Sequence, residues 1–143
     1  MKQIVETFSR EETVLFAQTV AKQIEKGCVI AFYGDLGAGK TSFVEGFVRQ
    51  LGFMGEVSSP TFSLVNEYRG GKFDVFHFDM YRIVGWEDLY STGYFDYLET
   101  NAILLIEWSE NIESALPNDV IRITIEKIAD THRKITVETG EIQ

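Results

Sequence analysis

The stretch from Gly34 to Thr41 carries the clearest chemistry in this sequence of 143 residues. Its letters, GDLGAGKT, fit the pattern G-x-x-x-x-G-K-[ST] of a phosphate-binding loop. Glycines let the backbone curl so that successive N–H groups point inward at phosphate oxygens. We expect Lys40 to reach the β- and γ-phosphates of a nucleotide and the Thr41 hydroxyl to bind Mg²⁺. The candidate nucleotide ligands in this stretch are Gly34, Asp35, Leu36, Gly37, Ala38, Gly39, Lys40, Thr41 and Ser42.

The segments on either side of the loop have the pattern that its chemistry requires. The apolar run CVIAFY at 28–33 predicts a strand buried on both faces, and a helix is expected from about 40 to 51, ended by Gly52. The positive amino end of such a helix favours an anion. Strand, loop and helix in this order favour phosphate binding over the alternative, which is a glycine-rich turn beside a surface lysine.

Two acidic residues follow strand-like runs and are candidates to serve a metal or an attacking water. Glu107 ends the run AILLIE, and Asp79 ends VFHFD. The carboxyl ends of parallel strands meet at one edge of a sheet, so both side chains are expected on the phosphate side. In phosphate-loop enzymes the acid that serves the metal is usually an aspartate. Because Glu107 is a glutamate, the sequence leaves open which of the two acids serves the metal. With Lys40 they are the catalytic candidates; the alternative is that each acid is a solvated strand end.

The connection VSSPTFSLVNEY at 57–68 lies where nucleotide switches carry a γ-phosphate sensor. Ser59 and Thr61 are the candidates, and the alternative is a capped turn held by Pro60.

Three residues near the acids have other expected roles. We expect His77 to be a partly buried, hydrogen-bonded histidine rather than a catalytic base. Arg82 is placed to pair with Asp79 or to face a partner, and Trp108 is expected to be a core or interface aromatic residue.

The remaining periodicities predict an α/β fold with a mixed, partly antiparallel sheet. A helix is expected over 9–27, with Ser9 and Glu12 as a capping box and Gly27 closing it. Short helical pieces are expected in WEDLYSTGYFDYL, 86–98. The expected strands are an edge strand at 4–8, a hairpin of 61–68 with 72–79, a buried strand at 102–108, and a closing hairpin of 120–128 with 133–139.

Composition indicates one domain spanning residues 1–143, with 45% hydrophobic residues and only two prolines. The formal net charge of −9 argues against a direct grip on a nucleic-acid backbone. The single cysteine, Cys28, lies in an apolar run and is expected to be a small buried hydrophobe in a reducing compartment. With no signal-like or membrane-spanning run, we expect a soluble, cytoplasmic protein.

Four motifs taken together resemble one family. GDLGAGKTSF, VSSPTFSLVNEY, FHFDMYRI and LLIEWSE occur in this order over most of the chain. The set is similar to the TsaE (YjeE/YdiB) family of bacterial tRNA threonylcarbamoyladenosine synthesis. The resemblance implies a three-layer P-loop NTPase-like fold, binding of ATP and Mg²⁺, and weak ATPase activity. It also implies work with the TsaB–TsaD pair, which modifies the adenosine beside the tRNA anticodon, so that tRNA is met only indirectly.

The resemblance also implies roles for individual residues. Thr41 and Glu107 match the Mg²⁺ ligands of the family, and Asp79 matches an acid near the nucleotide and the catalytic water. Thr61 matches a switch-like threonine. The segments FSREET and DTHR resemble segments lying toward the nucleoside, so Arg10 and Thr131 are expected nucleotide contacts.

Two other classes of function remain open. A small-molecule kinase shares the loop but usually has an arginine-rich lid, and the six arginines here are scattered. A nucleotide-gated binding module would use ATP only to order a surface. A GTPase is unsupported because no Asn-Lys-x-Asp segment is present. The partner surface is not readable: the aromatic residues Trp86, Tyr90, Tyr94 and Tyr97 are candidates for it or for a local core.

Overall fold

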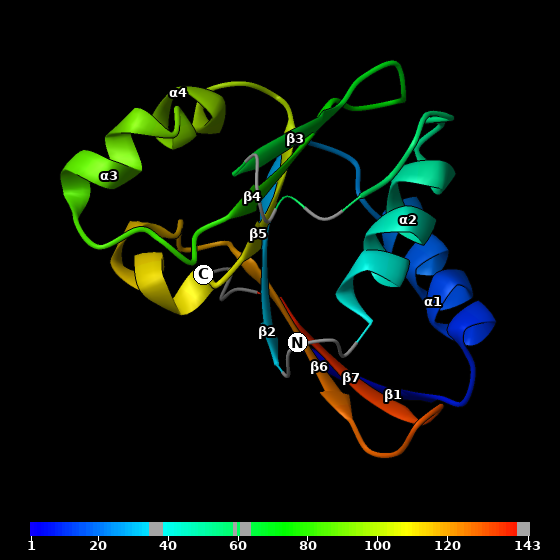
Figure 1. Ribbon diagram of the computed structural model, residues 1–143. Coiled ribbons are helices and arrows are strands. Elements are labelled where there is room, and N and C mark those ends of the chain that lie inside the picture. The colour runs from blue at the N-terminus through cyan, green and yellow to red at the C-terminus, as the bar shows by residue number, and fades with distance from the viewer. Residues whose placement is uncertain (35–38, 59, 61–63, 140–143) are drawn as a thin grey trace.

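The computed structural model describes residues 1–34, 39–58, 60 and 64–139. These residues form a seven-stranded sheet in the order β1-β7-β6-β2-β5-β4-β3 (Figure 1). The strands are β1 (Lys2–Thr7), β2 (Cys28–Gly34), β3 (Val65–Tyr68), β4 (Val75–Asp79), β5 (Ile103–Glu107), β6 (Ile121–Lys127) and β7 (Arg133–Glu138).

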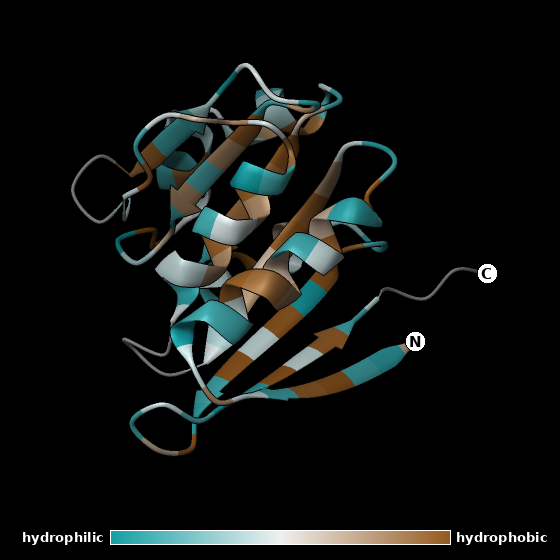
Figure 2. Ribbon diagram, turned by 90° about the vertical axis from the view of Figure 1, so that its right-hand side faces the viewer, coloured by the Kyte–Doolittle hydropathy of each residue, from teal (hydrophilic) through white to brown (hydrophobic). Residues whose placement is uncertain are grey.

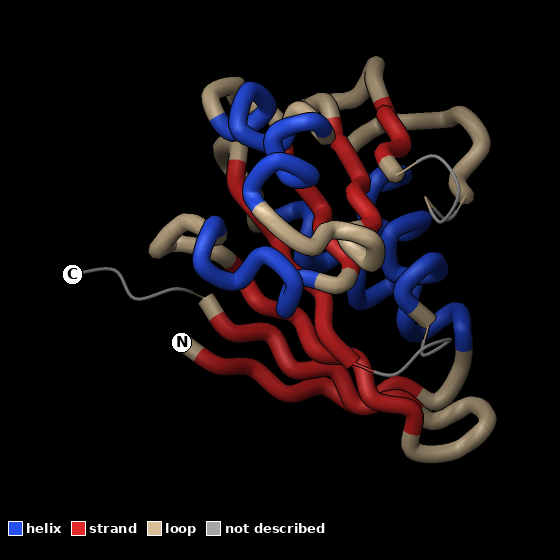
Figure 3. Tube along the Cα trace, turned by 60° about the vertical axis from the view of Figure 1, so that its left-hand side comes forward, coloured by secondary structure: helices blue, strands red, loops and turns tan. Residues whose placement is uncertain are grey.

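Helices cover both faces of this sheet and make three layers (Figures 1 and 3). One face carries α1 (Arg10–Lys22) and α2 (Lys40–Gln50), which lie side by side. The other carries α3 (Trp86–Ser91), α4 (Tyr94–Leu98) and the 3-10 helix η1 (Ser109–Ala115). The predicted three-layer α/β class is therefore confirmed.

The middle of the sheet is parallel and its flanks are antiparallel. Strands β6, β2, β5 and β4 run the same way, whereas β3, β7 and β1 are joined by antiparallel pairing. This confirms the mixed sheet, and the edge strand, the closing hairpin and the short helices lie close to their predicted ranges. The first hairpin is present, but β3 and β4 begin at Val65 and Val75, later than the predicted 61 and 72, and 61–63 lie outside the described residues. The carboxyl ends of the parallel strands and the amino end of α2 lie on the same side of the molecule (Figure 1).

The alternation of the strands builds one core on each face of the sheet. Phe32 of β2 packs edge-on against Phe43 of α2, with ring centroids 5.5 Å apart, and both side chains are fully buried. On the opposite face, Phe78 packs against the buried Tyr94 of α4. In Figure 2 the α1 and α2 ribbons lie in front of the sheet, and hydrophobic residues recur along the strands. The Phe32–Phe43 contact fixes the start of α2 relative to the strand that leads into the loop.

The first helix ends earlier than the sequence pattern indicates. Ser9 caps it as predicted, accepting a hydrogen bond from the Glu12 N–H at 3.1 Å, but the last helical residue is Lys22, not Gly27. The backbone tightens after Lys22, because the Gln23 N–H bonds to the Val20 carbonyl. Gly27 serves a different purpose: a Cβ there would lie 2.6 Å from the carbonyl carbon of Asn101. It permits a close approach between two chain segments and does not end the helix.

Candidate nucleotide-binding site

The amino end of α2 has the features of an anion site. Gly39 has a left-handed backbone, with φ of 104°, and α2 has no side-chain cap. The first N–H groups of a helix have no acceptor within it, so those at Lys40, Thr41 and Ser42 are available to an anion. The Lys40 ammonium lies 3.4 Å from the Gly34 carbonyl oxygen, and Thr41 is exposed. The predicted ligands Asp35, Leu36, Gly37 and Ala38 lie outside the described residues, as do Ser59 and Thr61 of the predicted switch segment.

The first glycine of the motif is required by the sheet itself. Gly34 has φ of 119°, and a Cβ there would lie 2.0 Å from the carbonyl oxygen of Ile125, its register partner on β6. Only glycine fits this backbone without displacing β6. The start of the loop is thereby fixed to the sheet.

The two predicted acids are brought together by strand register. Asp79 and Glu107 are direct partners at the carboxyl ends of the parallel strands β4 and β5, and β5 neighbours β2. Both side chains lie on the α2 face, because Leu105, two residues before Glu107, belongs to the core under α1 and α2. The Asp79 carboxylate accepts a hydrogen bond from the Tyr81 N–H at 2.9 Å. A pair of carboxylates therefore stands at the edge where α2 begins.

Arg82 does not pair with Asp79 in the part of the chain that the structure describes. Its side chain is exposed, and the other alternative, that it faces a partner, stays a prediction. Trp108 has a left-handed backbone with φ of 60° directly after Glu107, and its ring centroid lies 4.7 Å from that of Tyr81. It is half-buried against the second core, as expected for a core or interface aromatic residue.

The prediction that His77 is partly buried and hydrogen-bonded was wrong. The side chain is fully buried, and its Nε2 atom lies 2.6 Å from Oε2 of Glu107. The geometry at Nε2 is not that of a hydrogen bond, and among the described residues neither ring nitrogen has a hydrogen-bond partner. The short Nε2–Oε2 distance establishes a close polar contact between His77 and Glu107. The angles at this contact are outside the range of a hydrogen bond, so no hydrogen bond is formed in this arrangement.

A cavity of about 310 Å³ adjoins the amino end of α2 and holds residues that the sequence placed near a nucleoside. It brings Arg10 and Thr131 together with Gly39 and Ser42 of the loop. Arg10 forms an ion pair with Glu45. Its lining residues are Ser9, Arg10, Thr13, Gly39, Ser42, Asp130, Thr131 and Arg133.

Sequence reasoning missed Arg133 in this cavity. Its guanidinium donates to the carbonyl oxygens of Ala129 and Asp130, which holds the turn between β6 and β7 against the cavity. The signal was present, because Arg133 is the last residue of the segment DTHR, from which only Thr131 was taken as a nucleotide contact.

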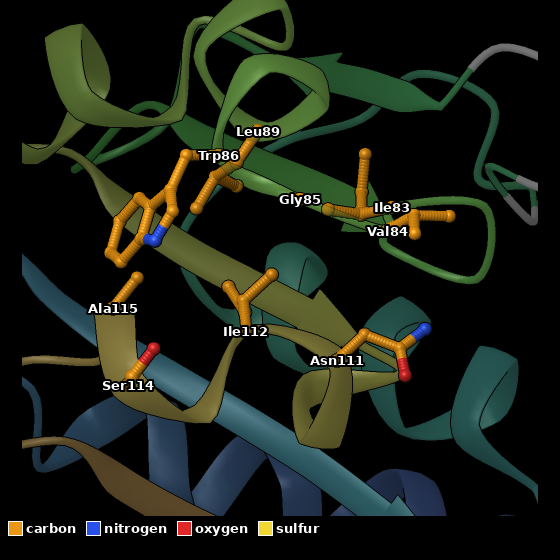
Figure 4. Close-up of a pocket in the computed structure, with 9 residues that line it drawn as sticks. All are labelled: Ile83, Val84, Gly85, Trp86, Leu89, Asn111, Ile112, Ser114 and Ala115. Carbon is orange, nitrogen blue, oxygen red and sulfur yellow. The ribbon is translucent and has the colours of Figure 1, made fainter.

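The four aromatic residues proposed as a surface or a core divide between the two. Trp86 and Tyr90 are 55% and 65% exposed, whereas Tyr94 is fully buried and Tyr97 packs on Phe76. A second cavity of about 190 Å³ lies between α3 and η1, and Trp86 projects along its wall toward Ala115 (Figure 4). Of these four residues, Trp86 and Tyr90 are therefore the two that are exposed to a partner.

Cys28 has the inert role that the sequence predicted. It packs against the first core, and burial raises the pKa of its thiol to about 11. Such a thiol stays protonated near neutral pH and is a poor nucleophile.

Comparison with known proteins decides the family. The family model described as threonylcarbamoyl adenosine biosynthesis protein TsaE matches residues 7–135. The chain belongs to the TsaE family. Proteins named tRNA threonylcarbamoyladenosine biosynthesis protein TsaE are similar to it: that of Bacillus subtilis is 39% identical, with 95% of this chain and 85% of the relative covered. That of Treponema pallidum is 36% identical, with 90% and 95% covered.

A solved TsaE-type structure has the same fold. The crystal structure of Bacillus subtilis YdiB superposes with a TM-score of 0.81 and 33% identity, covering 98% of this chain and 86% of that one. The fold of this chain is therefore like that of the solved structure over almost its whole length, and the site described above lies within the residues that the family model matches.

The donor set of the site fits a nucleotide with Mg²⁺. Lys40 and the amino end of α2 suit phosphate oxygens, and the hydroxyl of Thr41 and the carboxylates of Asp79 and Glu107 are hard oxygen ligands. No cluster of three or more His, Cys, Asp or Glu side chains able to hold a metal occurs among the described residues. Mg²⁺ does not need one, because it is usually held by one or two carboxylates together with substrate phosphates and water.

Proposed function

We propose that this protein binds and hydrolyses ATP with Mg²⁺ and acts in the threonylcarbamoyladenosine modification of tRNA. The observation that carries the proposal is the register of Asp79 with Glu107 at the edge of the sheet where α2 begins. An anion site beside two carboxylates is the minimum that phosphoryl transfer to water requires. Family membership supplies the pathway, because the relatives are named for tRNA threonylcarbamoyladenosine biosynthesis.

Each residue has a distinct task in this proposal. Lys40 and the N–H groups that open α2 hold the phosphates. Thr41 and Glu107 hold Mg²⁺, which when bound neutralises charge on the β- and γ-phosphates. Asp79 orients the attacking water; its Oδ1 is already held by the Tyr81 N–H, which leaves the other oxygen for this task.

The cavity beside Gly39 is the proposed place of the nucleoside. Arg10 and Thr131 line it next to the loop, which supports the contacts that the sequence indicated. Arg10 is paired with Glu45 here, so a nucleotide would compete with that ion pair.

We propose the TsaB–TsaD pair as the partner and tRNA as an indirect one. The net charge of −9 disfavours a direct grip on tRNA. The apolar residues Tyr81, Val84, Trp86 and Tyr90 are 55% to 92% exposed, and the contact of Tyr81 with Trp108 connects them to Glu107. A partner bound there would touch the chain segment that carries the metal acid. Neither the kinase nor the binding-module alternative has an observation of its own in its favour.

Binding of a fluorescent ATP analogue tests the proposal, with Lys40→Ala as the variant and Lys26→Ala as a charge-matched control. Lys26 is exposed and precedes β2, so it lies at the end of that strand opposite to the loop. Loss of one charge-assisted hydrogen bond to phosphate costs about 1.5–3 kcal/mol, so the affinity should fall by roughly 10- to 150-fold in Lys40→Ala alone. Equal affinity in the two variants would remove the phosphate loop from the account.

A further inference from the structure

His77 is a titratable side chain that contacts one of the two proposed catalytic acids, yet the proposed reaction gives it no task. It lies in the middle of β4, is 0% exposed, and approaches Oε2 of Glu107 to 2.6 Å through Nε2. Buried polar groups are normally hydrogen-bonded, and within the described residues this ring has no aligned partner. Glu107 is therefore the group through which this histidine can be satisfied.

Glu107 can meet the ring with little rearrangement. Its side chain is 17% exposed at the end of β5, and the terminal torsion of a glutamate carboxylate is broad and soft. A small turn of the carboxylate lets it accept the Nε2–H. With Oε2 held in this way, Oε1 is the oxygen that remains for the open edge where α2 begins, with Thr41 in its first turn.

We propose that His77 is a positioning residue: its Nε2–H holds Oε2 of Glu107 and thereby directs Oε1 toward the metal. The proposal rests on the proposed function, because it takes Glu107 as a metal ligand. Hydrogen bonds of this kind fix ligating carboxylates, and their loss typically costs about 10- to 100-fold in metal affinity. If the histidine only filled the core, metal affinity would not depend on the position of an N–H donor at residue 77.

Three substitutions separate these two roles. His77→Gln places an amide N–H near the position of Nε2, whereas His77→Asn places one near Nδ1. His77→Phe keeps the ring and removes both nitrogens. If His77 positions Glu107, only the glutamine should preserve metal binding, although the phenylalanine is the better filler of the core.

The contact itself is tested first, in the protein without nucleotide, by the ¹⁵N NMR signals of the histidine rings. The chain has two histidines, and His132, which pairs with Glu6, is the internal control. We expect Glu107→Gln to move the His77 signals and to leave those of His132 in place. Unmoved His77 signals would overturn the proposal.

The role is then tested by Mn²⁺ titration, followed by electron paramagnetic resonance, with ADP present. We expect His77→Phe and His77→Asn to bind Mn²⁺ about tenfold or more weakly and His77→Gln to stay near the wild type. ADP affinity in the presence of EDTA should be unchanged in all three, because the loop is intact.

The outcomes also separate this proposal from the proposed function. Equal Mn²⁺ affinity in the wild type and in His77→Phe would overturn the role of His77 and leave the nucleotide site standing. A wild type that binds no Mn²⁺ with ADP would overturn both.

Discussion

Replacing Gly34 by alanine should destabilise the protein at the end of β2, where the loop begins. Two separate costs arise at this residue. Its φ of 119° is a backbone conformation that side chains other than glycine rarely adopt, and the added Cβ would lie 2.0 Å from the Ile125 carbonyl oxygen. Either the backbone of β2 must change or β6 must move.

The size of the effect follows from these two costs. A positive φ costs a non-glycine residue about 1–2 kcal/mol, and overpacking of a fitted site costs about 1–3 kcal/mol. Together they predict a loss of roughly 2–5 kcal/mol in the free energy of unfolding. Since small domains are stable by about 5–15 kcal/mol, most of the variant should remain folded and its nucleotide binding can be measured.

Urea unfolding followed by circular dichroism measures this loss, and two other glycines provide matched controls. Gly70→Ala has the positive φ, 98°, with nothing within 4 Å of the new Cβ. Gly27→Ala has the close contact, 2.6 Å to Asn101, without a positive φ. We expect each control to cost less than Gly34→Ala, and nucleotide affinity to fall only in Gly34→Ala. A Gly34→Ala variant no less stable than Gly70→Ala would refute the close approach of β2 to β6.

Three further predictions concern the nucleoside cavity, the cysteine and the exposed aromatic surface. Arg10→Ala should weaken the fluorescent ATP analogue roughly fivefold, the worth of about one net hydrogen bond, and unchanged affinity would remove Arg10 from the site. Burial raises the pKa of the Cys28 thiol from 9.0 to about 11, so at pH 8 it should react with Ellman's reagent roughly 100-fold more slowly than an exposed cysteine. The reaction should become faster as the pH rises toward 11, and labelling at the rate of an exposed cysteine would contradict the burial of Cys28. Trp86→Ala should leave urea unfolding nearly unchanged and weaken any effect of TsaB–TsaD on turnover. Leu15 is similarly exposed, on the opposite helical layer, and Leu15→Ala should leave the effect of TsaB–TsaD unchanged; an equal loss in both variants would contradict the proposed surface.

Local patterns were enough to predict the elements that hold the site. The strand before the loop is continuous and apolar because β2 is covered on both faces, and α2 begins where the motif places Lys40. Asp79 and Glu107 could be placed at strand ends from the same kind of pattern.

Contacts between distant segments could not be predicted, because they depend on strand order. That Asp79 and Glu107 are direct neighbours requires β4 to pair with β5, and nothing local specifies this pairing. The same pairing places His77 in contact with Glu107. This contact could not be predicted, because the sequence shows only the aromatic neighbours of His77 on its own strand. Gly27 was misinterpreted for the same reason. A glycine after a helical pattern indicates a helix end, but here the glycine is required by the close approach of Asn101, which is distant in the sequence.

The most direct test of the central claim is ADP production by the purified protein, alone and with TsaB–TsaD and tRNA, in the wild type and in Glu107→Gln. We predict slow turnover alone, faster turnover with the partners, and little turnover in Glu107→Gln although it still binds the ATP analogue. Turnover that is indifferent to the partners, or that survives the loss of the Glu107 carboxylate, would contradict the account.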